Sequence, residues 1–225
     1  MNLHRVDILL GTGNHHKAKE VQQILDISNQ VCEFSIDDAE IGLKFPWELP
    51  GETIDPEENG KSLAENALIK ANAFAEHYNF PAIADDTGLF VDALGGAPGI
   101  YAARYAGENC TFEDNNRLLL KNLEKVNERD RTARFICVVV LAFPMRFNIK
   151  PYIVEGILEG RIATRYSGYK GFGYDSIFIT TSGVSLAELS LEEKNRISHR
   201  GKAFRKMFSH IATDFELLEE FAITK

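Results

Sequence analysis

Two adjacent carboxylates, Asp85 and Asp86, are the side chains of this 225-residue sequence with the clearest capacity for chemistry. An apolar run at residues 82–84 precedes them, and a second one follows at 89–91. This pattern predicts two strands that meet at a sharp bend, because side chains of a straight strand alternate between its faces. Close carboxylates repel each other unless a cation or a shared proton relieves them, and Mg²⁺ favours carboxylate oxygens together with phosphates and water. The pair therefore predicts a magnesium site, and the alternative is a hairpin with an ordinary surface Asp-Asp pair.

A glycine-containing turn at residues 11–14 separates an apolar run at 6–10 from a helical pattern that begins at His15. A strand, a turn and a helix start leave backbone N–H groups free to bind an anion. Lys17 opposes the helix dipole in the first turn, so it is better placed for a ligand than for stability. The spacing of a Walker A loop is absent. The turn predicts phosphate binding, and a helix that merely begins with polar residues is an equal alternative.

An acidic loop and a helix precede the Asp pair. Residues 37–60 read as irregular because proline and glycine interrupt any period, and loops of this length are usually functional or mobile. On the helix predicted at 62–78, Asn66 and Lys70 lie four residues apart, so both could reach one ligand. An acidic run is more often a solvated edge than a metal site; here it comprises Glu52, Asp55, Glu57 and Glu58.

The second half of the chain contains a glycine-rich segment and a basic one. Repeated glycines at 167–175 let the backbone approach a flat ligand, and Phe172 or Tyr174 could form a wall for it, although an ordinary connection is an equal alternative. Ser198 is predicted to cap a final helix, near whose start cations are unfavourable without an anion. The cations gathered there are Lys194, Arg196, His199 and Arg200.

Apolar patterns predict the remaining elements. A helix capped by Thr111 is expected to run to about residue 126, and the glycines and proline of 95–99 require a tightly shaped loop. No repeat or linker divides the chain, so one domain over residues 1–225 is expected. Further strands are predicted at 31–36, 132–143, 151–163 and 177–179.

Composition excludes several classes of protein. With 44% hydrophobic and 26% charged residues, the chain is that of a globular protein. A net charge of −8 argues against a broad basic surface for a nucleic acid polymer. Three scattered cysteines predict reduced thiols, and no apolar run is long enough for a signal peptide or a membrane span. We expect a cytoplasmic protein without a membrane partner.

Taken together, these segments resemble the inosine triphosphate pyrophosphatase family, enzymes that remove non-canonical purine nucleotides. The resemblance extends from residue 6 to about 220, and the order of its segments makes it specific. The matching segments are 12–17 with Glu20, 65–67 with 70–71, 84–107, 171–175 and 193–201.

The resemblance implies a mixed α/β fold, in which a long, bent central sheet with flanking helices forms two lobes around a nucleotide cleft. It also implies a homodimer that uses Mg²⁺ to hydrolyse a nucleoside triphosphate to the monophosphate and pyrophosphate. Asp86 and Lys70 would be catalytic. The metal ligands would be drawn from Glu57, Glu58, Asp85 and Asp86.

The resemblance assigns the remaining site residues to the substrate. Phosphate would be held by the turn, that is by Thr12, Gly13, Asn14, His15, His16 and Lys17, and Thr87 would also touch the substrate. The nucleoside would be held by Phe172, Gly173, Tyr174, Asp175, Lys194, His199 and Arg200.

The sequence departs from the family pattern in three places. The acidic loop is long, Ser176 replaces a proline, and His15 and His16 replace smaller or different residues, with no individual role assigned to them. Two alternatives stay open. One is the related Maf-type pyrophosphatase, which acts on pyrimidine or modified nucleotides, and the other is a catalytically silent nucleotide-binding protein.

Overall fold

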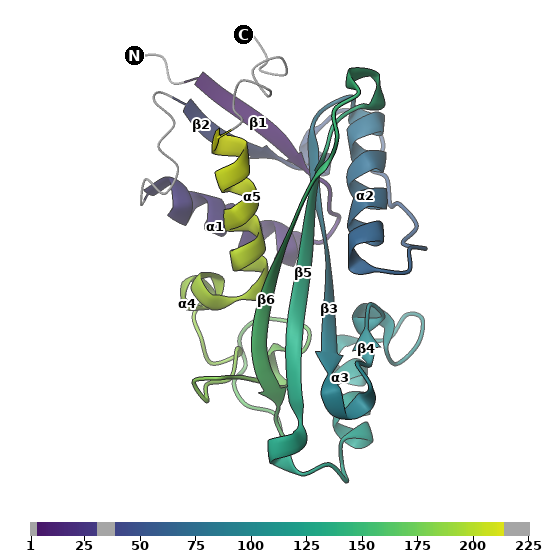
Figure 1. Ribbon diagram of the computed structural model, residues 1–225, viewed down its shortest axis with the longest axis vertical. Helices are drawn as coiled ribbons and strands as arrows, with labels where there is room; N and C mark the ends of the chain where they lie inside the picture. The colour runs from purple at the N-terminus through teal and green to yellow at the C-terminus, as the bar shows by residue number, and fades with distance from the viewer. Residues whose placement is uncertain (1–3, 31–38, 214–225) are drawn as a thin grey trace. The chain divides into compact units, whose positions relative to one another are not determined.

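The computed structural model describes residues 4–30 and 39–213, and within them the strands form one mixed sheet (Figure 1). The sheet order is β2-β1-β3-β5-β6-β7, with β4 paired to β3. The helices are α1 (His15–Gln30), α2 (Leu63–Tyr78), α3 (Phe112–Asn122), α4 (Leu191–Ile197) and α5 (His199–Thr213). The strands are β1 (His4–Leu10), β2 (Ala39–Lys44), β3 (Ala82–Val91), β4 (Pro98–Gly99), β5 (Thr132–Ala142), β6 (Tyr152–Ile162) and β7 (Phe178–Thr180).

The chain forms two compact units, which are described separately. Unit 1 comprises residues 1–86, 138–155 and 201–225, and unit 2 comprises 87–137 and 156–200. The boundary within β3 falls between Asp86 and Thr87. The predicted α/β class with a mixed sheet and flanking helices is confirmed, while the predicted cleft and the single domain stay predictions.

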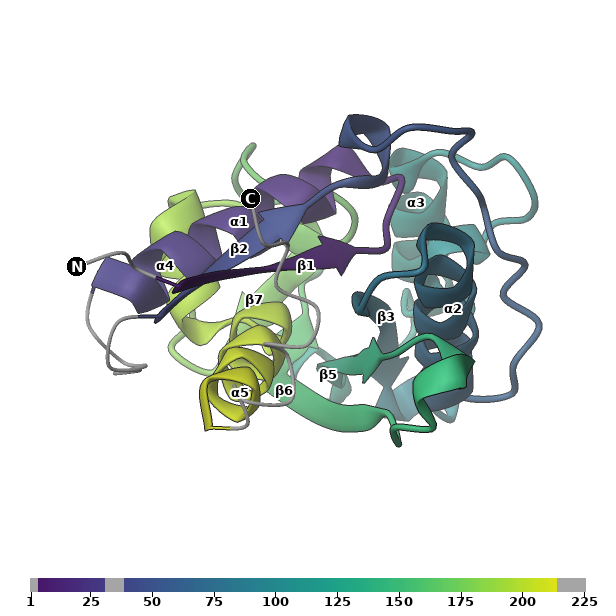
Figure 2. The ribbon, with the colours of Figure 1, turned by 90° about the horizontal axis from the view of Figure 1, so that it is seen from above.

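In unit 1, β1 pairs in parallel with both β2 and β3. Its residues Val6, Ile8 and Leu9 are all buried, as expected of a strand covered on both faces. The two covering helices, α1 and α5, lie on opposite sides of the β1–β2 pair (Figure 2). Each directs an apolar stripe inward, comprising Ala18, Val21, Ile24 and Leu25 in α1 and Phe204, Met207, Phe208 and Ile211 in α5.

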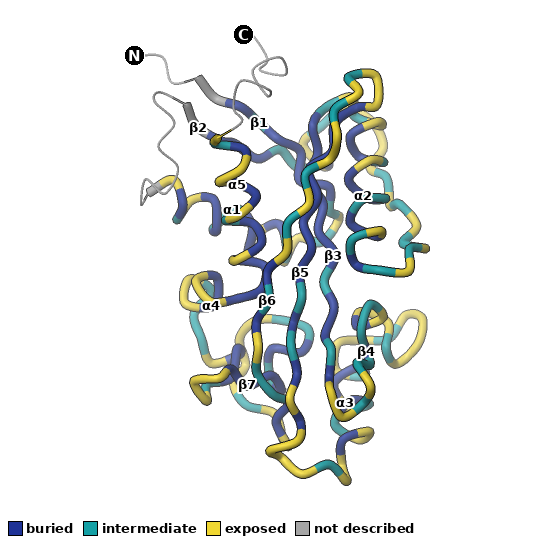
Figure 3. The backbone as a smooth tube through the Cα atoms, in the orientation of Figure 1, coloured by how far each residue is buried: buried dark blue, intermediate teal, exposed yellow. Residues whose placement is uncertain are grey.

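Helix α2 confirms the prediction for residues 62–78 almost to the residue. Ser62 accepts the N–H of Glu65 at 3.1 Å as the N-cap, and Asn79 ends the helix in the left-handed conformation. One side of α2 is buried and the other is exposed (Figure 3). Small residues on the buried side allow close packing, and a Cβ added to Gly11 would lie 2.5 Å from the Phe74 ring.

Unit 2 has its own apolar core, built from β3, α3, β5, β6 and β7 and from residues near them. Thr111 caps α3 and forms a capping box with Asp114, as its sequence position predicts. The helix ends at Asn122, short of the predicted residue 126. Core members include Leu89, Leu119, Phe135, Ile162, Tyr174 and Phe178.

Three predictions of secondary structure were wrong. β3 is one continuous strand rather than two strands joined at a bend. β2 occupies residues predicted to be irregular, because pairing with β1 overrides the strand-weakening effect of Gly42. The sequence reading also missed α4, whose capping box joins Ser190 and Glu193.

Other predictions were confirmed or lie outside the described residues. Strands β5, β6 and β7 fall within or beside their predicted ranges, and positive φ at Gly95, Gly96 and Gly99 confirms the tight loop. Helix α5 begins at His199, directly after the extended backbone of Ser198. The strand predicted at 31–36 lies outside the described residues. None of the helices in the described part of the chain has the length and apolar character needed to cross a bilayer.

Candidate functional site

The carboxyl end of β1 lies beside the amino end of β3 in unit 1. The two strands are parallel, with Leu10 opposite Ile83, and the Gly11 N–H donates to the Ile83 carbonyl at 2.7 Å. β1 stops there, whereas β3 continues through Asp85 and Asp86. The predicted phosphate turn follows the carboxyl end of β1, a position that commonly binds ligands in parallel sheets. Asp85 and Asp86 lie in β3, two and three residues beyond the Ile83 that pairs with Leu10.

The turn at residues 11–14 is held by its own side chains. Thr12 Oγ1 accepts the Asn14 N–H at 3.1 Å. Asn14 Oδ1 accepts the N–H groups of His16 and Lys17 at 2.9 and 3.2 Å, which makes Asn14 the cap of α1. Gly13 is exposed, and a Cβ there would meet no atom within 4 Å. These hydrogen bonds hold the turn together, and its polar residues are partly exposed.

His15 makes a contact that the sequence did not predict. Its ring lies 4.3 Å from that of Trp47, measured between centroids, and Trp47 stacks on Phe45 at 5.0 Å. Trp47 lies in the short helix Pro46–Glu48 of the acidic loop. The loop is thus packed against the start of α1 through aromatic rings.

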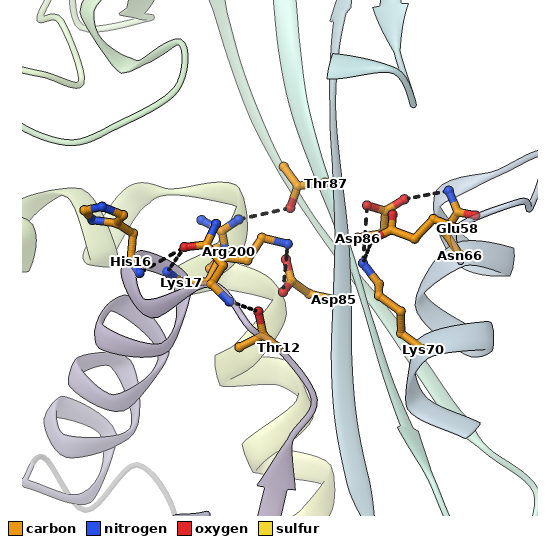
Figure 4. Close-up of polar contacts among 11 residues, drawn as sticks. Thr12, His16, Lys17, Glu58, Asn66, Lys70, Asp85, Asp86, Thr87 and Arg200 are labelled. Atoms are coloured by element: carbon orange, nitrogen blue, oxygen red, sulfur yellow. Dashed lines mark hydrogen bonds and ion pairs between the residues drawn. The ribbon is translucent and has the colours of Figure 1, made fainter. Parts of the chain in front are cut away.

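Asp85 and Asp86 leave β3 on opposite sides, and each meets its own lysine (Figure 4). The Asp85 oxygens lie 3.2 and 3.3 Å from Lys17 Nζ, whereas Asp86 Oδ1 lies 3.7 Å from Lys70 Nζ. Both carboxylates are almost fully buried. The continuous strand therefore separates the two carboxylates, and cations from two different helices neutralise them.

Asp86 is surrounded by polar groups of α2 and of the acidic loop. Asn66 Nδ2 donates to Asp86 Oδ2 at 3.1 Å. Lys70 Nζ donates to Glu58 Oε1 at 2.8 Å and thus contacts two carboxylates at once. The i, i+4 spacing of Asn66 and Lys70 brings both to one group, as predicted, but that group is Asp86. We call Lys17, Glu58, Asn66, Lys70, Asp85 and Asp86 the carboxylate–lysine cluster.

Opposing effects set the charges within this cluster. Burial raises the pKa of Asp86 above its ordinary value of 3.8 and the Glu58 carboxylate adds to the rise, while Lys70, Lys17 and the Asn66 hydrogen bond oppose it without cancelling it. Burial lowers the pKa of Lys70, but Asp85, Asp86 and Glu58 outweigh burial and raise it above 10.5. The lysine therefore stays charged at neutral pH, and Asp86 is a stronger base than an exposed aspartate.

The predicted metal ligands Glu57 and Glu58 differ in whether they lie beside Asp86 and Lys70. Glu58 and Asp86 share Lys70 as a partner, whereas Glu57 is exposed and its carboxylate forms no ion pair with a described residue. Among the described residues, no three or more His, Cys, Asp or Glu side chains converge closely enough to hold a metal ion by themselves. Two carboxylates fit Mg²⁺, which commonly takes one or two protein ligands and completes its shell with phosphates and water.

Unit 2 contains the predicted nucleoside-binding residues. Asp175 Oδ2 accepts from Lys194 Nζ at 2.5 Å and from the Phe172 N–H at 2.9 Å, and both members of the ion pair are buried. Gly171 has a φ of +75°, and a Cβ there would lie 2.1 Å from Asp175 Oδ2. The carboxylate therefore fixes the loop and the lysine together. We call Phe172, Asp175, Lys194, His199 and Arg200 the basic cluster.

Two cations of the basic cluster face the same aromatic ring. Lys194 Nζ and Arg200 Cζ lie 4.8 and 5.9 Å from the centroid of Phe172, within cation–π range. Arg200 Nη2 also donates to Thr87 Oγ1 at 3.3 Å, and the His199 ring stacks on Phe135 at 4.5 Å. These basic side chains are buried rather than solvated.

The structure distinguishes among the other residues of the glycine-rich loop. Tyr174 lies in the core of unit 2, and its hydroxyl donates to the Ala102 carbonyl at 2.8 Å, so its ring is not a wall for a ligand. The Gly173 carbonyl accepts from Asn116 Nδ2 at 3.0 Å. Sequence reasoning missed Asn116, because a polar residue on an amphipathic helix gives no indication of burial. Arg196 is exposed and pairs with Glu192.

Comparison with known proteins identifies the family. The family model described as Ham1 family matches residues 8–210. The chain belongs to the Ham1 family. A Ham1 relative from Elusimicrobium minutum, named dITP/XTP pyrophosphatase, is 47% identical over 208 residues, which cover 91% of this chain and 98% of the relative. A protein of the same name from Thermoanaerobacter is 43% identical, covering 93% and 98%.

Solved structures of Ham1 proteins share the fold. A HAM1 protein from Coxiella burnetii superposes with a TM-score of 0.78 at 38% identity, covering 93% of this chain and 99% of that one. A dITP/XTP pyrophosphatase from Mycobacterium abscessus gives a TM-score of 0.66 at 35% identity, covering 89% and 97%. The predicted relation to purine nucleotide pyrophosphatases is therefore confirmed.

Proposed function

We propose that this chain hydrolyses non-canonical purine nucleoside triphosphates, namely those of inosine, deoxyinosine and xanthosine, to the monophosphate and pyrophosphate with Mg²⁺. Membership of the Ham1 family and the shared name of the relatives support the coarser statement, a nucleoside triphosphate pyrophosphatase. The inosine substrates and the magnesium requirement are the finer part of the proposal. The observation that carries it is the carboxylate–lysine cluster beside the phosphate turn.

In this proposal the turn and the two lysines of the cluster hold the triphosphate. Lys17 lies in the first turn of α1, and its side chain is 19% exposed while it pairs with Asp85. Lys17 and Lys70 offset the charge on phosphate oxygens as pyrophosphate leaves, which is the main catalytic contribution in phosphoryl transfer. Glu58 and Asp86 would hold Mg²⁺, which supplies neutralisation of phosphate charge when bound.

Asp86 is the residue proposed to act on water. Its raised pKa favours acceptance of a proton, and Asn66 fixes the direction of its carboxylate. The water oxygen bonds to phosphorus, its proton passes to Asp86, and the bridging P–O bond between the α- and β-phosphates breaks. Asp85 remains paired with Lys17 on the opposite side of β3 and has a supporting role.

Base recognition is proposed for the basic cluster. Lysine and arginine side chains only donate hydrogen bonds, so they suit the 6-oxo group of inosine or xanthosine and not the 6-amino group of adenine. A site with a buried polar group left unpaired by the wrong base discriminates strongly. The proposed donors are Lys194, His199 and Arg200, and Phe172 is the ring against which the lysine and the arginine lie.

We further propose that the protein acts as a cytoplasmic homodimer that clears these nucleotides from the pool. The thiols of Cys110 and Cys137 support a reducing compartment. The dimer is inferred from the family resemblance.

A panel of triphosphates tests this function. Inosine, deoxyinosine, xanthosine, guanosine, adenosine and pyrimidine triphosphates are incubated with Mg²⁺, and pyrophosphate and orthophosphate are measured separately. We expect pyrophosphate from the first three at rates far above that from adenosine triphosphate. Orthophosphate with a diphosphate product would refute the reaction type. Preference for pyrimidines would favour the Maf-type alternative, and binding without any product would favour the silent one.

A further inference from the structure

Lys70 occupies the position between the two carboxylates to which Mg²⁺ is assigned. Its ammonium lies 2.8 Å from Glu58 Oε1 and 3.7 Å from Asp86 Oδ1, and the lysine is 8% exposed. Glu58 comes from the acidic loop and Asp86 from β3, so no local sequence constraint joins them. In the cation-free protein, Lys70 is a positive charge that offsets the repulsion between these two carboxylates.

Asn66 supports the same arrangement independently of Lys70. Its Oδ1 accepts the Gly60 N–H at 2.8 Å, and its Nδ2 donates to Asp86 Oδ2 at 3.1 Å. A Cβ at Gly60 would lie 2.6 Å from Asn66 Oδ1, so the loop approaches α2 as closely as glycine permits. The acidic loop is therefore tied to α2 two residues beyond Glu58. Loss of the Lys70 ammonium would leave the Asn66 contacts in place.

We propose that Lys70 acts as an internal counter-ion that competes with a divalent cation for the Glu58–Asp86 pair. The inference rests on the proposed function, because it takes these carboxylates as the magnesium ligands. When the cation binds, the ammonium turns away from the pair on its flexible four-carbon stem and is available to substrate phosphate. The protein thereby avoids an uncompensated pair of carboxylates, the buried Asp86 and the half-buried Glu58, in the absence of the cation.

The physical consequence is negative coupling between the ammonium and the cation. Two positive charges at one carboxylate pair repel, and such coupling is reciprocal, since each binds more tightly when the other is absent. Removal of the Lys70 charge should therefore strengthen magnesium binding. A lysine that only binds phosphate predicts no such gain in nucleotide-free protein.

The test measures Mg²⁺ binding to the nucleotide-free protein by calorimetry, with the magnesium-induced rise in Tm as a second readout. Lys70→Met should bind Mg²⁺ on the order of tenfold more tightly than wild type, as expected for a coupling of this kind. Its Tm should be lower than that of wild type without the ion and rise more when the ion is added. Lys70→Arg keeps the charge and should stay close to wild type. Lys70→Gln serves if the methionine variant does not fold.

Two controls separate competition from general electrostatics. Lys17→Met removes a charge from the same cluster but on the Asp85 side of β3, and it should give a smaller gain. Lys44→Met removes a lysine that pairs with Asp7 between β1 and β2, and it should leave magnesium affinity unchanged. Equal gains in all three variants would show an effect of net charge and overturn the proposal.

Failure of the inference differs from failure of the proposed function. If wild type binds Mg²⁺ and Glu58→Gln abolishes that binding, but Lys70→Met and Lys70→Gln bind no more tightly than wild type, Lys70 is not a competitor. If wild type does not bind Mg²⁺, or if Glu58→Gln and Asp86→Asn bind as wild type does, the magnesium site itself is misassigned.

Discussion

The groups around Asp86 have opposite effects on the pKa of its carboxyl group. Burial and Glu58 raise its pKa, whereas Lys70, Lys17 and Asn66 favour its charged form, and the net result is a raised pKa. A carboxylate in this situation costs stability when it is ionised and gains reactivity as a base. We therefore expect the ionised Asp86 side chain to increase activity and to decrease the stability of the fold.

Asp86→Asn should lower kcat by on the order of 10²–10⁴, the usual contribution of a positioned acid or base. The asparagine keeps the size of the side chain and can still accept from Asn66, so the fold should be retained. Turnover of inosine triphosphate, measured as pyrophosphate release, checks this. Asp85→Asn is the comparison, and its loss of activity should be milder. A fully active Asp86→Asn protein would defeat the assignment.

The same variant predicts a pH dependence of stability. Because the folded pKa of Asp86 is raised above its ordinary 3.8, wild type is stabilised by protonation of Asp86 and loses this stabilisation as the pH rises through the folded pKa. Without Mg²⁺, Asp86→Asn should therefore melt higher than wild type at pH 7. The difference in Tm should shrink as the pH falls through the folded pKa of Asp86, because wild type then also becomes neutral at this position. A lower Tm for the variant at pH 7 would mean that Asp86 is mainly structural.

The basic cluster makes a prediction about base preference. His199→Ala and Arg200→Ala should each reduce the ratio of kcat/KM for inosine over adenosine triphosphate by roughly 5- to 150-fold, which corresponds to about 1–3 kcal/mol for a lost hydrogen bond to a polar group. Arg196→Ala is the matched control, because Arg196 is exposed and pairs with Glu192. Unchanged ratios in both test variants would remove these residues from base recognition.

At the scale of elements, ties between distant segments position both clusters. The acidic loop is tied to α2 through Gly60 and Asn66, and the glycine-rich loop is tied to α3 through Gly173 and Asn116. In each case an asparagine side chain on a helix meets the backbone of a loop. Such contacts fix loop geometry with little apolar burial, so substitutions there should affect function as much as stability.

Arg131 is the clearest structural tie in unit 2. Its guanidinium is buried and donates to the carbonyls of Leu123, Val126 and Ala163, at 2.8, 3.1 and 3.0 Å. It thereby fastens the end of α3 to the residue after β6. In Arg131→Met the Leu123 carbonyl keeps the Val126 N–H at 2.9 Å, whereas the carbonyls of Val126 and Ala163 lose this donor. The free energy of unfolding should fall by about 2–6 kcal/mol, since each unsatisfied buried group costs about 1–3 kcal/mol. Urea unfolding checks this, with the exposed Arg129→Met expected to change stability by less than about 0.5 kcal/mol.

At the scale of the whole molecule, the chain carries a net charge of −8 and yet gathers Lys17 and Lys70 in one cluster and Lys194 and Arg200 in another. An acidic protein that binds a polyanionic substrate must gather its positive charge locally, because its average field repels the ligand. Both clusters do this with lysine or arginine side chains that are paired or stacked. The net charge and the proposed triphosphate substrate are therefore compatible.

We also predict a homodimer, on the basis of the family resemblance. Light scattering at micromolar concentration should give twice the 25.2 kDa mass of the chain. A mass equal to that of one chain would contradict this prediction. Activity measured across a dilution series would then show whether one chain suffices for turnover.

The sequence by itself determined the features that depend on neighbours in the chain. The helix at 62–78, the cap at Thr111, the apolar stripes of α1 and α5, and the tight loop around Gly95 all follow from short-range rules, and the structure confirms them. The order of polar segments was enough to predict the family. Residue types also indicated that the carboxylates, the lysines and the basic segment are the groups that bind metal and substrate.

Tertiary structure alone decided which of these groups meet. The sequence predicted a bend that would bring Asp85 and Asp86 together. In the structure β3 is one continuous strand, so Asp85 pairs with Lys17 and Asp86 pairs with Lys70. Lys17 lies 68 residues from Asp85, so their contact depends on the register of β1 against β3. The choice of Glu58 over Glu57 depends in the same way on how the acidic loop meets α2. Such contacts lie beyond the range of local periodicity, because they are fixed by packing between segments that are distant along the chain.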